Sequence, residues 1–269
     1  MDETSTALPT TDTVKSEPIT YANYHSIITG VERTWNYGGF PLSDGTFWFY
    51  REPNATVVVE GNRLRVTAQL SRSNDQVQIL DNAKNMFFST RTFAPPENGS
   101  ISFEWEQKAR CMGTAPGDLY DGFISVNLLD FTTGAALDFF VCNDIISTVY
   151  AILRFPGIPI LPDKEQDDRP KYFCDFGELP IETTLGQLHR YCISYHRGKD
   201  EVAYRVDGNE VARYHDVPIK FNSFLIALGL MTEKTIENGK SVSVHGQTLI
   251  GEWSGFTITT TEDWLAETT

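Results

Sequence analysis

Hydrophobic and polar residues alternate along most of this chain in short runs. Such alternation is typical of β-strands with one side in a core and the other toward solvent. Helical patterns are scarce, and only residues 183–189 and 263–267 predict short helices. We expect strands at residues 46–51, 55–60, 63–70, 101–110, 122–130, 135–143, 147–155, 190–197, 201–206, 210–215, 224–231 and 248–259.

Turn-forming sequences separate several of these runs, at residues 60–62, 130–134, 197–200 and 207–209. Because Gly, Asn and Asp tolerate the backbone angles of tight turns, these sequences predict antiparallel hairpins. Parallel strands would need long helical crossovers, which the pattern does not supply. The predicted fold is therefore all-β: a two-sheet antiparallel jelly-roll β-sandwich in a single domain.

The domain boundary is set by composition. Residues 1–20 hold few apolar groups to offset the entropy of ordering them, so we expect a disordered N-terminal tail. The folded domain is then residues 21–269. Residues 111–122 are rich in Gly and Pro and predict a loop at one end of the sandwich, and the Pro-rich residues 155–170 predict a surface loop or lid.

Charge limits the partners of this protein. The formal net charge is −14, which repels nucleic-acid phosphates and anionic lipids, so we expect neither nucleic acid nor membrane as a partner. The start of the chain has no basic segment followed by an apolar one, which favours a cytoplasmic location. The glycosylation patterns at Asn54 and Asn98 are a minor argument for export. The four cysteines are widely spaced and read as free thiols, with two disulfides as the alternative.

Residues 189–214 carry a hairpin whose turn is Val206-Asp207-Gly208, and residues 249–258 end the domain with Trp253 and Phe256. These segments resemble the late strands of concanavalin A-like lectin and glucanase domains. The resemblance implies a jelly-roll fold and, in the glucanases, a strand with the pattern Glu-x-Asp-x-Glu that places its carboxylates on one face.

Only the middle position of that pattern is matched in the corresponding strand of this chain. Asp138 lies between Ala136 and Phe140, which stand where the two outer carboxylates would be. This departure disfavours a retaining glycosidase of the glucanase type.

The same region supplies the predicted catalytic residues: Asp138, Tyr150 and Arg154. They occupy even positions on two neighbouring strands, and pairing is expected to gather them on one face. With Phe140 and Asn143 beside them, they would form an apolar pocket with polar anchors for a small-molecule substrate. The alternative is an Arg–Asp pair that neutralises itself within the sheet.

A second set of candidates alternates along residues 101–110. Glu104, Glu106 and Lys108 share one face of the predicted strand, and Trp105 lies on the other. We include all four as substrate-binding candidates. The alternative is a solvated strand face with alternating charge and a core tryptophan, a reading that also applies to Trp35 and Trp48.

Metal and cofactor motifs are weak. The five histidines form no His-x-His or Glu-x-x-His pair, so we expect no catalytic metal and no cofactor. Asp118 and Asp121 are candidate calcium ligands, with a plain Asp-Gly turn as the alternative. Lys84 reads as a solvated residue at the start of an apolar strand.

Two functions remain open. The first is a cofactor-independent biosynthetic enzyme (an isomerase, cyclase or lyase) that acts on a largely apolar small metabolite in the sandwich cleft. The alternative is a carbohydrate-binding, lectin-like module or a glycan-active enzyme, which the resemblance implies. A homo-oligomer is compatible with either.

Overall fold

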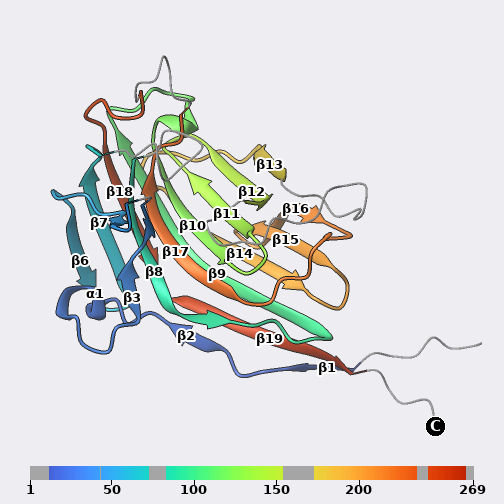
Figure 1. Ribbon diagram of the computed structural model, residues 1–269. Helices are drawn as coiled ribbons and strands as arrows, with labels where there is room; N and C mark the ends of the chain where they lie inside the picture. Colours follow the sequence, from blue (N-terminus) through green and yellow to red (C-terminus); the bar gives the residue numbers. More distant parts are fainter. Residues whose placement is uncertain (1–11, 43, 73–82, 154–172, 235–241, 265–269) are drawn as a thin grey trace, which may run out of the picture.

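The computed structural model describes residues 12–42, 44–72, 83–153, 173–234 and 242–264. It is a β-sandwich of two curved antiparallel sheets, as the sequence predicts (Figure 1). The one described α-helix, α1, spans His25–Thr29, and a single 3-10 turn, η1, spans Leu119–Asp121. In the described part of the chain, no helix has the length and apolar character needed to cross a bilayer.

The larger sheet, sheet A, is organised around its longest strand, which pairs with three neighbours. Its path runs β16 (Asn209–Tyr214), β15 (Glu201–Val206), β14 (Leu188–His196), β9 (Gly99–Met112), β18 (Thr248–Ser254), β7 (Arg63–Gln69) and β6 (Thr56–Glu60). Strand β19 (Phe256–Trp264) also pairs with β9 and carries β1 (Asp12–Lys15) and β2 (Ile19–Tyr21) on its other edge.

The second sheet, sheet B, contains the strands that are buried along their whole length. Its order is β13 (Phe173–Glu178), β12 (Ile146–Ile152), β11 (Ala135–Val141), β10 (Phe123–Asp130), β17 (Phe224–Met231), β8 (Lys84–Phe93) and β3 (Trp35–Tyr37). A separate hairpin of β4 (Gly39–Pro41) and β5 (Phe47–Phe49) extends from the β3 edge.

The core lies between the two sheets and is rich in aromatic rings. Trp105 of sheet A stacks on Tyr191 at 5.7 Å and contacts Phe139 of sheet B edge-on at 5.9 Å. The Tyr204 hydroxyl, also from sheet A, donates a hydrogen bond to the backbone oxygen of Val149 in β12 at 2.6 Å. These contacts fix which face of each strand points inward, because side chains alternate along a strand.

The hairpin turns lie where the sequence predicts them. Asp207 and Gly208 both have positive φ angles, 52° and 82°, between β15 and β16. Two successive positive φ angles belong to the turn that matches the right-handed twist of paired strands, which explains Asp-Gly at this place. This turn sets the register of the β15–β16 pair.

Several expectations at the ends of the chain are wrong. Within the predicted tail, β1 and most of β2 are ordered against β19. The helix expected at residues 183–189 is a turn around Gly186, which has φ 74°, and Leu188 already begins β14 opposite Lys108. The predicted helix at residues 263–267 falls partly in β19 and partly outside the described residues, and the predicted loop at 155–170 lies wholly outside them.

Candidate active site

The candidate active site lies on the outer face of sheet B, the face that points away from sheet A. Phe139 of β11 points into the core, so its neighbours Asp138 and Phe140 point outward. Asn127 of β10 is directly opposite Asp138 in the strand register. The strand register therefore brings two buried polar side chains together on this face.

Two further ionisable groups, Lys84 and Glu233, lie within electrostatic range of Asp138. Lys84 begins β8 and is opposite Met231, the last residue of β17. Glu233 follows two residues later, and its backbone N–H donates to the Tyr120 oxygen at 2.9 Å. Both side chains are partly buried. We call Asp138, Asn127, Lys84 and Glu233 the sheet-B cluster.

Burial controls the ionisation of this cluster. It raises the pKa of Asp138 well above its usual range; the Glu233 carboxylate raises it further, and the Lys84 ammonium opposes the rise. Burial also raises the pKa of Glu233, again opposed by Lys84. For Lys84, burial lowers the pKa, and the attraction of first Glu233 and then Asp138 acts against this. Desolvation disfavours each charged form, and the charges of the three groups act on one another, so Asp138, Glu233 and Lys84 titrate as a coupled set.

One oxygen of Asp138 has no hydrogen-bond partner among the described residues. The side chain is 4% exposed, and Oδ1 is buried without a partner anywhere in the described part of the chain. The neighbouring Asn127 amide donates elsewhere, to Ser125 Oγ at 2.9 Å and to the Ala227 oxygen at 3.2 Å. A buried polar atom without a partner costs about 1–3 kcal/mol, and a catalytic role is one of the explanations for such an atom.

Aromatic rings surround this part of the face. Phe140 stacks on Phe123 of β10 with ring centroids 4.2 Å apart, and Phe176 of β13 is 6.1 Å from Phe140. The side chains next to Asp138 along β11 and across on β17 are small: Ala136 and Ala227. The predicted residue Phe140 thus lies on the same face as Asp138.

The expected grouping of Asp138 with Tyr150 is wrong. Asp138 is opposite Val149 in the register, and Tyr150 is opposite Leu137, so the two side chains point to opposite faces of sheet B. Tyr150 packs in the core, with its ring 4.8 Å from that of Tyr214. Arg154 lies outside the described residues.

Asn143 has a structural position at the end of β11. Its Oδ1 accepts the backbone N–H of Cys111 at 2.8 Å, and its Nδ2 donates to the Cys111 oxygen at 2.6 Å. The side chain thereby joins the turn that follows β11 to the end of β9. Cys111, Cys142 and Cys192 are free thiols.

The second predicted set lies on the outer face of sheet A, where the alternative interpretation holds. Glu104, Glu106 and Lys108 share this face and pair with residues of other strands of the sheet: Glu104 with Arg190, Glu106 with Arg63, and Lys108 with Glu252 at 3.4 Å. Trp105 points the other way and is 2% exposed in the core. The expectation that Trp105 contacts a ligand is therefore wrong.

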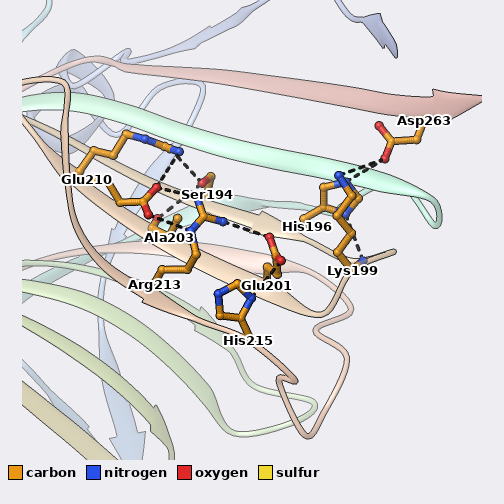
Figure 2. A network of polar contacts seen from close by, with 10 residues as sticks. Ser194, His196, Lys199, Glu201, Ala203, Glu210, Arg213, His215 and Asp263 are labelled. Atoms are coloured by element: carbon orange, nitrogen blue, oxygen red, sulfur yellow. Dashed lines mark hydrogen bonds and ion pairs between the residues drawn. The ribbon is translucent and has the colours of Figure 1, made fainter. Parts of the chain in front are cut away.

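Figure 2 shows a polar network at the β14–β16 end of the same outer face. Arg213 bonds to Glu201 at 3.0 Å and also to Glu210, and the imidazole of His196 contacts Asp263 at 2.9 Å. A hollow of about 350 Å³ lies among these side chains. Because its charged groups already pair with one another at the surface, this network has the character of a solvated face.

The calcium expectation fails on charge. Lys234 contacts both candidate ligands, Asp118 at 2.9 Å and Asp121 at 2.8 Å, so an ammonium occupies the place of a cation. His245 also contacts Asp121 at 2.9 Å. Among the described residues, no three His, Cys, Asp or Glu side chains gather as metal ligands.

Sequence reasoning missed Lys84 and Glu233. Lys84 was expected in solvent, yet it lies beside the acidic groups of the cluster. The two residues are far apart in the sequence, and their proximity depends on the pairing of β8 with β17. The one usable signal in the sequence is a charged residue beside an apolar run. Lys84 precedes the run Met86-Phe87-Phe88, and Glu233 follows β17.

The fold is a jelly roll of the concanavalin A-like kind. Endo-1,3-β-glucanase from Streptomyces sioyaensis superposes with a TM-score of 0.53 at 13% identity, covering 95% of this chain and 99% of the glucanase. A β-glucanase from Bacillus licheniformis gives 0.52 at 12% identity, over 90% and 98% of the two chains. The endo-β-1,4-glucuronan lyase from Trichoderma reesei gives 0.50 at 13% identity, over 83% and 93%.

Identities this low show a shared fold and leave the activity open. The sequence itself matches the model of a family of unknown function (DUF6081) over residues 24–262, and the chain belongs to that family. None of the curated proteins matches it.

Proposed function

We propose that this protein is a glycan-active enzyme whose carbohydrate ligand is bound at the outer face of sheet B. The observation that carries the proposal is the buried Asp138 carboxyl, which has an unpartnered oxygen and a second carboxyl, Glu233, within electrostatic range. Two carboxyl groups held in different ionisation states are the usual requirement for general acid–base cleavage of a glycosidic bond.

The electrostatics assign a role to each group. Asp138 has the strongly raised pKa and is the proton donor. Lys84 interacts more strongly with Glu233 than with Asp138, so Glu233 is the carboxylate that stays ionised. Lys84 is a positioning residue, because its charge keeps one carboxyl ionised while the other holds a proton.

The reaction follows from these roles. Asp138 donates its proton to the glycosidic oxygen, which leaves with the electron pair of the breaking bond. Glu233 accepts a proton from a water molecule whose oxygen forms the new bond to the anomeric carbon. One proton is given and one is taken, so charge and atoms balance.

The fold supports the substrate class. The Streptomyces and Bacillus structures, with TM-scores above 0.5, are glucanases, and the Trichoderma structure is a glucuronan lyase. This chain departs from Glu-x-Asp-x-Glu, a pattern in which the carboxylates share one strand. Here the proposed second carboxyl, Glu233, follows β17 and does not share the strand of Asp138.

A second function is favoured by a specific observation, the apolar surroundings of Asp138. Phe123, Phe140 and Phe176 pack along the same face, and the adjacent side chains are alanines. Such walls suit the isomerase, cyclase or lyase acting on an apolar metabolite, with the same carboxyl moving a proton.

A ligand screen separates the two functions. The wild-type protein is melted in the presence of neutral and acidic oligosaccharides and, separately, of apolar polycyclic metabolites. A ligand at 100 times its Kd stabilises the folded state by about 2.7 kcal/mol, which a melting curve resolves. The proposal expects oligosaccharides to raise Tm and to be cleaved.

Matched variants make the screen specific to this face. In Asp138→Asn, we expect cleavage to fall by about 10²–10⁴-fold, the usual range for loss of a general acid. Glu104→Gln on sheet A is the control and should retain wild-type cleavage. Stabilisation by apolar metabolites alone, or equal activity in both variants, would contradict the proposal.

A further inference from the structure

A cleft of about 510 Å³ lies at the β3 edge of the sandwich, and no residue of the sheet-B cluster is among its described lining residues. It is bordered by α1 on one side and by the β4–β5 hairpin on the other. Its volume is in the range of sites for small organic ligands. Its lining includes Arg33, Tyr37, Phe47, Phe49, Arg51 and Phe87.

Aromatic side chains are unusually exposed at this cleft. Phe47 and Phe49 are 50% and 52% exposed, and their rings are 4.8 Å apart. Opposite them, Tyr37 packs on Phe87 at 4.6 Å. Exposed aromatic residues that gather at one hollow mark a binding surface, because burying them against a ligand gains free energy.

The charge of the cleft is opposite to that of the whole protein. Two guanidinium groups line it, Arg33 and Arg51, and no carboxylate is among its described lining residues, although the net charge of the chain is −14. Neither arginine has an ion pair in the described part of the chain, in contrast to Arg63 and Arg190 on sheet A. Arg51 lies over the Tyr37 ring at 4.9 Å, which holds its guanidinium at the wall of the cleft.

We propose that this cleft binds a ring that carries a carboxylate. The apolar face of the ring packs on Phe47 and Phe49, and the carboxylate pairs with Arg33 and Arg51. The planar guanidinium donates hydrogen bonds to both oxygens of a carboxylate, so arginine suits this role better than a point charge. A uronic acid residue of an oligosaccharide and a small aromatic acid share this chemistry.

Isothermal titration calorimetry of the full chain tests the proposal with three probes. These are a β-1,4-linked glucuronic acid trisaccharide, benzoate and neutral cellotriose. We expect at least one of the two acids to bind, with an affinity that falls as salt is added, and cellotriose to bind at least 10-fold more weakly. The acid that binds identifies the source of the carboxylate. No binding of either acid at 10 mM (about the weakest Kd the method resolves), or equal binding of cellotriose, would overturn the proposal.

Variants locate the binding. Arg51→Gln should weaken the acid by about 10-fold, since a charged hydrogen bond contributes roughly 1.5 kcal/mol, and Phe49→Ser should weaken it by a similar factor. The matched controls are Arg190→Gln and Leu185→Ser, both at exposed sites elsewhere, and neither should change the affinity.

If Arg51→Gln does not fold, Arg33→Gln takes its place, because Arg33 is exposed and, within the described part of the chain, its side chain bonds only to the Gly30 oxygen, at 3.3 Å. Asp138→Asn should bind the acid as the wild type does, which separates this cleft from the proposed catalytic face. Unchanged affinity in the arginine variants would overturn the assignment to this cleft.

Discussion

The two outer faces of the sandwich both carry acidic and basic side chains, and they differ in what those groups contact. On sheet A, Glu104 and Glu106 pair at the surface with arginines of other strands of the same sheet. On sheet B, Asp138 is buried, one of its oxygens has no partner in the described chain, and its charge state depends on Lys84 and Glu233.

The difference is one of solvation. When two charged side chains pair at the surface, each gives up contacts with water for contacts with the other. The net gain in stability is therefore small, about 0–1 kcal/mol. A buried carboxyl gives up its hydration and responds by holding its proton. The carboxyl with the strongly raised pKa therefore lies on sheet B, whereas Glu104 and Glu106 on sheet A lie in surface ion pairs.

The largest expected effect compares two adjacent residues of β9. Trp105→Ala should lower the free energy of unfolding by about 3–5 kcal/mol, because the ring fills the core between the sheets. Glu104→Ala should lower it by less than about 1 kcal/mol. Urea unfolding of both variants measures this, and a small loss for Trp105→Ala would contradict the assignment of Trp105 to the core.

The next effect is a pH dependence of opposite sign on the two faces. The folded-state pKa of Asp138 is raised above its unfolded value of about 3.9, so the folded protein holds more protons in the interval between them. The free energy of unfolding should fall as pH rises through that interval, by up to about 1.4 kcal/mol per pH unit for this group, and Asp138→Asn should show a smaller fall, because only the part due to Glu233 is left.

On sheet A, hydrogen bonds from Arg213 lower the pKa of Glu210, so its contribution is present above about pH 4.3 and is lost as pH falls. Glu210→Gln should remove that small acid-side loss and leave the fall due to Asp138 unchanged. Denaturant unfolding across pH 3–8 compares the two variants. The contrast between the two faces would be contradicted if Asp138→Asn and Glu210→Gln changed the pH dependence of the unfolding free energy in the same direction.

The smallest effect is the coupling between Arg63 and Glu106, whose side chains are 46% and 38% exposed. A double-mutant cycle with alanine at each position should give a coupling energy of about 0.2–1 kcal/mol that decreases in 1 M salt. A coupling above 2 kcal/mol would mean that this face is organised more strongly than a solvated sheet surface.

Local pattern was sufficient for the sandwich and insufficient for the site. Alternation predicted strands such as β15 and β17, and Asp207-Gly208 predicted its hairpin, because both signals act over a few residues. The face of a strand is harder to predict. Asp138 and Tyr150 occupy even positions, yet the register of β11 against β12 separates them.

Long-range pairing decided the rest. Lys84 and Glu233 meet only because β8 pairs with β17, and nothing in either local sequence fixes that pairing. The ordering of Asp12–Lys15 likewise depends on β19, at the other end of the chain. The few apolar residues at the start of the chain therefore predicted a disordered tail, although the edge of β19 offers these residues a pairing partner.

The most direct test of the account is a carboxyl ¹³C NMR titration of Asp138, with the resonance assigned by its loss in Asp138→Asn. The account predicts a midpoint well above the ordinary value of about 3.9, and a higher midpoint still in Lys84→Met, because the ammonium that opposes the rise is gone. A midpoint at or below about 3.9, unchanged by Lys84→Met, would contradict a buried acid–base cluster on the outer face of sheet B.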